Sequence, residues 1–150
     1  MIRYLTVDEV IETHSKTVDK SGGGLHGVLH RGRIESILGH MQNDDYYPTV
    51  ADKLAYLFFG LSTGHCFADG NKRIAITATV QMLLNNGYFA IVKRFMVEME
   101  NITVHVATGV ISRDLLRDII SCHLNLDPDN EEIKLRLYEC ISNAIPPEGQ

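Results

Sequence analysis

The sequence has little of the material from which disulfide frameworks, zinc sites and membrane spans are built. Its 150 residues include only three cysteines, at Cys66, Cys122 and Cys140. Because that number is odd and the spacing is wide, neither a disulfide framework nor a cysteine-based zinc site is expected. No apolar run approaches the roughly 18 residues that a membrane-spanning helix needs. We therefore expect a protein that neither spans a membrane nor has a membrane as its partner.

The charge balance and the first residues narrow the expected partners and location. The chain carries 14 Lys and Arg residues against 19 Asp and Glu residues, a net charge of −5. A sequence-independent nucleic-acid binder needs a basic face, so direct nucleic-acid binding is not expected. The acidic balance does not exclude a local cationic pocket, which would form if the fold brought together Arg31, Arg33, Lys72, Arg73, Lys93 and Arg94. The opening MIRYLTVDEV lacks the apolar region and cleavage site of a signal peptide, which predicts a cytoplasmic protein.

Most of the chain has helical spacing instead. Thr6 to Glu9 has the S/T-x-x-E form of a capping box and opens a helix that ends at the glycines after Ser21. Further helices are predicted over 31–43, from Thr49 or Asp52 to Gly64, from Asp69 or Asn71 to 85–87, over 95–108, over 113–124 with Ser112 as cap, and over 131–145. The segment 88–92 is short enough to be extended. Residues 53–61 are apolar nearly all round, which indicates a central, buried helix.

These segments predict an all-α fold without internal repeats. The sequence is 45% hydrophobic and 22% charged, which suits one globular domain with a proper core. Leu126-Asp127-Pro128-Asp129 breaks the helical pattern near the end. We therefore expect one helical domain over 1–126 and a C-terminal helical extension over 127–150, whose apolar face consists of Ile133, Leu137, Tyr138 and Ile141.

One stretch, HCFADGNKR from His65 to Arg73, concentrates polar chemistry between two apolar segments. A turn between two buried helices would place residues 69–72 at a helix N-terminus, where free N–H groups and the helix dipole favour an anion. Gly70 allows close approach of a phosphate, and the cations supply charge. Asp69 is a natural Mg²⁺ ligand and His65 suits a general base. The pattern favours phosphate-transfer chemistry over the alternative in which Asp69 only caps the helix, with Phe67 as an apolar anchor.

Two other patterns match known binding motifs only in part. GGGLHG at 22–27 formally satisfies G-x-G-x-x-G, but a helix rather than a strand precedes it, so we interpret it as a Gly-rich interhelical loop that closes over a site. His26 and His30 stand four residues apart without the glutamate of a zinc motif. His14, His105 and His123 are isolated and are assigned no function.

The stretch from His65 to Arg73 resembles the H-x-F-x-(D/E)-(G/A)-N-(G/K)-R signature of the Fic/Doc family. GGLHGVLHRGRIESILGHMQ, at 23–42, is similar to the region before that motif in the Doc (death on curing) toxin branch, and the resemblance extends over about 4–126. It implies an all-helical fold with the motif looped between two central helices. It also implies the site residues: His65 as catalytic base, Asp69 as Mg²⁺ ligand, and Gly70, Asn71, Lys72 and Arg73 at the phosphates of ATP.

Three positions bear on the reaction. Lys72 stands where AMP-transferring members have glycine, and Ile76 where they have a second arginine. In the Doc branch this lysine accompanies a reversed nucleotide, so the γ-phosphate faces the target hydroxyl. The resemblance thus implies a toxin that phosphorylates a protein hydroxyl, a threonine of elongation factor Tu in that branch, and halts translation. Gly70 matches the AMP-transferring form, which leaves protein adenylylation as one alternative and a non-catalytic peptide-binding module as another.

Regulation is expected in trans. Many Fic proteins carry an inhibitory [S/T]-x-x-x-E-[G/N] helix, in which a serine or threonine stands four residues before the glutamate. Here Met96 stands four residues before Glu100 and Ala144 four residues before Glu148, so neither site matches the pattern. The resemblance therefore implies a separate antitoxin whose disordered tail folds into a groove. Thr63 stands where the Doc branch can carry an arginine, so we expect either that Lys93 or Arg94 substitutes for it or that the activity is altered. Loops 22–27 and 43–48 are the predicted walls of the target-binding groove.

Overall fold

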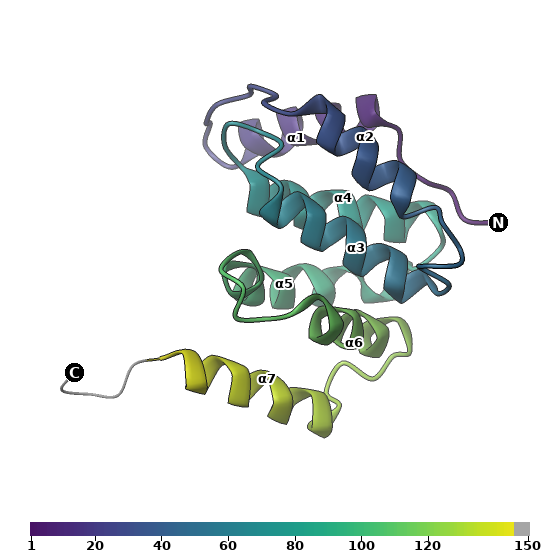
Figure 1. Cartoon of the computed structure of the whole chain (residues 1–150), viewed down its shortest axis with the longest axis vertical. Helices are drawn as coiled ribbons and strands as arrows, with labels where there is room; N and C mark the ends of the chain where they lie inside the picture. Colours follow the sequence, from purple (N-terminus) through teal and green to yellow (C-terminus); the bar gives the residue numbers. More distant parts are fainter. Residues whose placement is uncertain (146–150) are drawn as a thin grey trace.

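The computed structural model describes residues 1–145, and over that range it is all helical (Figure 1). Its elements are α1 (Val7–Lys20), α2 (Arg31–His40), α3 (Val50–Thr63), α4 (Asn71–Asn85), the 3-10 helix η1 (Phe89–Ile91), α5 (Val92–Ala107), α6 (Arg113–Leu124) and α7 (Glu131–Ala144). The predicted all-α fold is confirmed.

Three helices begin at caps that are visible in the sequence. The Thr6 side chain accepts from Glu9 N at 3.2 Å while the Glu9 carboxylate accepts from Thr6 N, so the predicted capping box is present. Thr49 and Asp52 form a second capping box at α3. Ser112 accepts from Leu115 N at the start of α6. Such caps satisfy N–H groups that a helix leaves unpaired in its first turn.

The helices form layers around a central pair, α3 and α4 (Figure 1). In the figure α1 and α2 lie above this pair, with α1 against α4 and α2 against α3, and α5 and α6 lie below it. Leu57, Phe58 and Leu61 of α3 and Ile74 of α4 are completely buried. This confirms the predicted central position of residues 53–61.

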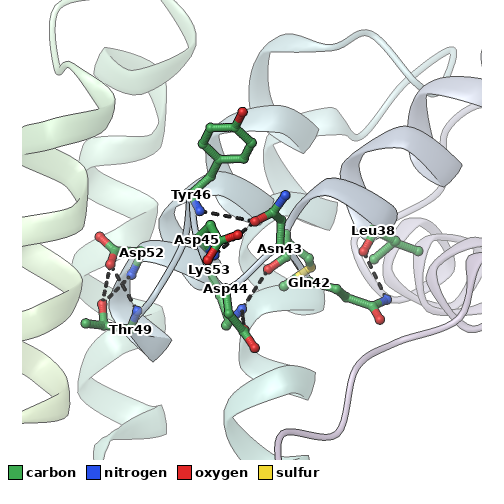
Figure 2. A network of polar contacts seen from close by, with 10 residues as sticks. Leu38, Gln42, Asn43, Asp44, Asp45, Tyr46, Thr49, Asp52 and Lys53 are labelled. Carbon is green, nitrogen blue, oxygen red and sulfur yellow. Dashed lines mark hydrogen bonds and ion pairs between the residues drawn. The ribbon is translucent and has the colours of Figure 1, made fainter.

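A polar network pins the α2–α3 connection to the first turns of α3 (Figure 2). Lys53 is only 2% exposed, and its Nζ donates to Asp44 Oδ1 at 2.7 Å and to the Met41 carbonyl at 3.1 Å. Asn43 Oδ1 accepts from the backbone N–H groups of Asp45 and Tyr46. A buried ammonium group needs such partners, so Lys53 fixes the connection in place.

Two local expectations are wrong. Helix α2 ends at His40 rather than near Asn43. Residues 89–91 form a 3-10 turn rather than an extended segment, because the chain turns tightly after Gly87 to bury Ile91. Helix α4 begins at Asn71, one of the two predicted starts, and Gly70 at φ +75° occupies its N-cap.

Helix α7 packs on α6 at the edge of the fold (Figure 1). Its inner face is half-buried and consists of Ile133, Leu137 and Cys140, whereas Tyr138, predicted on that face, is exposed. Arg136 donates to Asp118 of α6 at 2.7 Å. Residues 146–150, the end of the predicted extension 127–150 and the site of Glu148, lie outside the described residues. Across 1–145, no helix combines the length and apolar character needed to cross a membrane.

Candidate active site

Residues 64–70 connect the two central helices, as the flanking apolar segments predict. The loop follows the C-terminus of α3 and leads into the N-terminus of α4, at the end of the pair where the 22–30 segment also lies (Figure 1). Cys66 and Phe67 are buried, while His65 and Ala68 are exposed. The loop is therefore anchored at its centre and open to solvent on both sides of the anchor.

The Phe67 anchor rests on a histidine from helix α1. The His14 ring lies parallel to the Phe67 ring, with centroids 3.8 Å apart and 10° between the planes. His14 Nε2 is 2.7 Å from the Asp69 carbonyl oxygen, and the side chain is 1% exposed. Burial lowers the pKa of His14 below its usual 6.5, so the ring is neutral and Nε2–H donates to that oxygen.

The Asn71 side chain closes the loop. Its Oδ1 accepts from Phe67 N at 3.1 Å, and its Nδ2 donates to the Phe67 carbonyl at 3.0 Å. Both ends of the amide are thus used on the backbone of the loop itself. Asn71 belongs to the predicted phosphate-binding set, and in this structure its backbone N–H, rather than its amide, is available to a ligand.

The segment after the Gly-rich loop pairs with the motif from the outside. Leu29 N and His30 N donate to the Cys66 carbonyl at 2.8 and 3.1 Å, and Ala68 N donates to the Gly27 carbonyl at 2.8 Å. These bonds form an isolated antiparallel bridge between Val28 and Phe67. The predicted wall at 22–27 therefore lies beside the site. The predicted wall at 43–48 does not, because it precedes the opposite end of α3, a helix about 21 Å long.

His65 is held in an unusual backbone conformation. Its φ is +50°, a left-handed value that costs a non-glycine residue about 1–2 kcal/mol and that recurs at functional sites. Arg33 of α2 donates to the carbonyl of the preceding Gly64. Burial raises the pKa of the neighbouring Cys66 thiol, which keeps it protonated and unsuited to act as a nucleophile.

Asp69 lies between the helix terminus and the Gly-rich loop. Its Oδ1 accepts from Gly70 N at 2.7 Å and lies 3.6 Å from Arg73 Nη2. A Cβ at Gly24 would come within 2.7 Å of Asp69 Oδ2, so only a glycine lets the carboxylate occupy this position. The side chain is 47% exposed, so one face of the carboxylate remains accessible.

A cavity of about 340 Å³ brings five of the six predicted site residues together. It is lined by His65, Asp69, Gly70, Asn71 and Lys72, with Ser62, Thr63, Ala68, Ala107 and Thr108 completing the wall. Arg73 faces the adjoining groove between α1, α4 and α5 and reaches this group through its contact with Asp69. The helix dipole and the backbone N–H groups of residues 71–73, which have no acceptor within the described chain, favour an anion here.

The donor set fits Mg²⁺ only together with a phosphate ligand. Residues 1–145 contain no cluster of three or more His, Cys, Asp or Glu side chains that could hold a metal alone. Mg²⁺ characteristically uses one or two carboxylates and completes its shell with water and substrate phosphates. Asp69 would supply the carboxylate ligand, and a phosphate bound at the neighbouring helix N-terminus would supply further oxygen ligands.

The predicted substitutes for an arginine at position 63 are wrong. Arg94 pairs with Asp129, and both Lys93 and Arg94 lie in the first turn of α5, whereas the last turn of that helix lines the cavity. Arg33 of α2 instead donates to the carbonyl of Gly64, directly before the motif. His14, to which the sequence assigns no function, contacts the motif directly. Its sequence signal is the spacing Val10, His14, Val18, which places a histidine on a fully buried face that must supply a hydrogen-bond partner.

Two comparisons with known proteins agree with this geometry. A sequence model of the Fic/DOC family matches residues 4–83. The chain is also 32% identical to a protein named protein kinase doc, from Escherichia phage P1, over 123 residues that make up 79% of this chain and 94% of that protein.

Proposed function

The chain belongs to the Fic/DOC family, in its Doc branch, and we propose that it is the toxin of a toxin–antitoxin pair that transfers the γ-phosphate of Mg-ATP to a hydroxyl of a target protein. The observation that carries the proposal is the 340 Å³ cavity, in which an exposed histidine, a carboxylate and a helix N-terminus converge. Residues 1–126 are the proposed transferase domain, and 127–150 are an accessory extension.

In this proposal each residue has a separate task. The His65 imidazole takes the proton from the target hydroxyl as its oxygen bonds to the γ-phosphorus, and ADP leaves with the electrons of the broken P–O bond. The N–H groups at the start of α4 and the Lys72 ammonium hold the phosphates, with Arg73 at the edge of the site. Asp69 would hold Mg²⁺, which neutralises phosphate charge when bound.

Kinase activity is proposed over AMP transfer for three reasons. Lys72 lines the cavity and adds a cation where AMP-transferring members have glycine. Gly70, the residue that favours AMP transfer, has a local reason to be glycine in this chain. Its φ is +75°, and a Cβ would lie 3.2 Å from Val18 Cγ2 and 3.3 Å from His14 Nε2. The relative named protein kinase doc also supports the kinase proposal. Protein adenylylation is the alternative.

The proposed partners approach from two sides. A target segment would enter between His65 and the backbone of residues 27–30, and elongation factor Tu, a cytoplasmic protein, is the proposed target. An antitoxin supplied in trans would occupy the groove of about 580 Å³ between α1, α4 and α5. That groove is lined by Lys16, Lys20 and Arg73, so an antitoxin segment there would touch the edge of the phosphate site.

The proposal is tested by toxicity in bacterial cells. His65→Ala removes the base but no hydrogen bond of the fold, because the exposed His65 side chain makes none among the described residues. We expect the variant to be non-toxic, with the helical circular dichroism and melting temperature of the parent. His40→Ala, an exposed histidine at the far end of the molecule, is the matched control and should stay toxic. A His65→Ala protein as toxic as the parent would contradict the proposal.

A further inference from the structure

Helix α1 reaches the candidate active site through buried side chains, and the polar one among them is His14. His14 makes two contacts of different kinds: its ring face stacks on Phe67 and its Nε2–H donates to the Asp69 carbonyl. The stack fixes the plane of the imidazole, and the hydrogen bond fixes its rotation within that plane. Since both contacts lie on the motif loop, His14 determines where α1 holds that loop.

The hydrogen bond acts on a peptide unit that also controls the carboxylate. The carbonyl that accepts from His14 belongs to the peptide between Asp69 and Gly70, and the N–H of that peptide donates to Asp69 Oδ1 at 2.7 Å. A peptide unit is planar, so turning its carbonyl turns its N–H as well. His14 thereby sets the orientation of the Asp69 carboxylate and of the first N–H groups of α4, although it touches neither.

We propose that His14 is a positioning residue for the transfer reaction, one that orients Asp69 toward its metal ion and the start of α4 toward the phosphates. The proposal rests on the proposed function of the site. A residue that only filled the core would be replaceable by any ring of similar size. If His14 is a positioning residue, a variant that keeps the ring but lacks the N–H donor should lose the orientation of Asp69.

Two substitutions separate the ring from the donor. His14→Phe keeps an aromatic ring against Phe67 and removes the N–H, while His14→Gln keeps an amide donor at a similar reach and removes the ring. Removal of groups that orient a metal ligand typically weakens metal affinity or activity about 10–100-fold. We therefore expect His14→Phe to raise the half-saturating Mg²⁺ concentration for γ-phosphate transfer by at least about tenfold. His14→Gln should recover part of this loss.

A second readout does not depend on activity. Amide hydrogen exchange of Ala68, Gly70 and Ile74, whose N–H groups are hydrogen-bonded in the parent, should be faster in His14→Phe and closer to the parent in His14→Gln when measured without nucleotide. Mn²⁺ binding in the presence of a non-hydrolysable ATP analogue, followed by electron paramagnetic resonance, should weaken in the same order. His123→Phe is the matched control, because His123 is equally buried and contacts Phe95 on the α5–α6 side of the core.

The outcomes distinguish this inference from the proposed function. If the parent transfers no label from ATP, the proposed function fails, and the exchange and Mn²⁺ measurements still decide the role of His14. A His14→Phe protein with the parent's Mg²⁺ dependence and exchange rates would overturn the inference. So would a His14→Gln protein that is no better than His14→Phe in every readout, because the donor would then have no part.

Discussion

Replacement of Asn71 by alanine should destabilise the protein even when no nucleotide is present. The side chain bonds both the N–H and the carbonyl of Phe67, at 3.1 and 3.0 Å, and Asn71→Ala leaves both backbone groups without that partner. Each such bond contributes about 1 kcal/mol, and a buried group left unpaired costs about 1–3 kcal/mol. Because solvent reaches part of the loop, we take about 2 kcal/mol in total. For a domain of this size that lowers the melting temperature by about 4–8 °C.

Thermal unfolding followed by circular dichroism measures this loss, with Lys72→Ala as the neighbouring control. The Lys72 side chain is exposed and makes no hydrogen bond among the described residues, so its removal should shift the apo melting temperature by less than about 2 °C. The family resemblance places Asn71 at the phosphates instead. An Asn71→Ala protein that melts with the parent but no longer binds ATP would refute the structural reasoning and support that role.

Two further predictions concern a charged contact and a glycine. The bonds from Lys134 and Arg94 lower the pKa of Asp129 from 3.8 to about 2, so this contact stabilises the attachment of α7 above pH 4 and is lost as the pH falls toward 2. The exchange protection of the α7 amides, corrected for the intrinsic pH dependence of exchange, should fall across that window in the parent but not in Asp129→Asn, and identical profiles would contradict this assignment. Gly24→Ala should displace the Asp69 carboxylate and weaken Mg²⁺-dependent transfer, whereas Gly23→Ala, with open space at its Cβ, should show only the backbone cost of about 1 kcal/mol. Equal Mg²⁺ dependence in the two glycine variants would rule out that contact.

The predictions that succeeded from sequence depended on neighbours within one turn of helix. The capping box at Thr6 joins residues three apart, so the pattern alone specifies the contact, and Thr49, one of the two predicted caps of α3, lies three residues from its partner Asp52. The buried position of α3 follows from an apolar surface on every side. The location of the motif between α3 and α4 follows from the two apolar segments around it.

The failures involve contacts between distant segments or side chains with more than one use. His14 and Asp69 are 55 positions apart, and nothing in either local sequence links them. The Asn71 side chain can bind a phosphate or form hydrogen bonds with the backbone of the loop, and the sequence does not distinguish these two roles. Loop 43–48 precedes the predicted helix that ends at Gly64 and the motif follows that helix, so the order of the elements already separates the two, and the buried Lys53 holds the loop at the far end.

The proposed transfer of the γ-phosphate of ATP to a protein at this site is tested most directly with ATP that is labelled at one of two phosphates. The parent and His65→Ala proteins would be incubated with a bacterial lysate, Mg²⁺ and ATP labelled at either the γ- or the α-phosphate. We predict transfer from γ-labelled ATP alone, to a protein of the size of an elongation factor, and none with His65→Ala. Transfer of the α-label would identify an AMP transferase, and no transfer of either label by folded, inhibitor-free parent protein would contradict an enzymatic role.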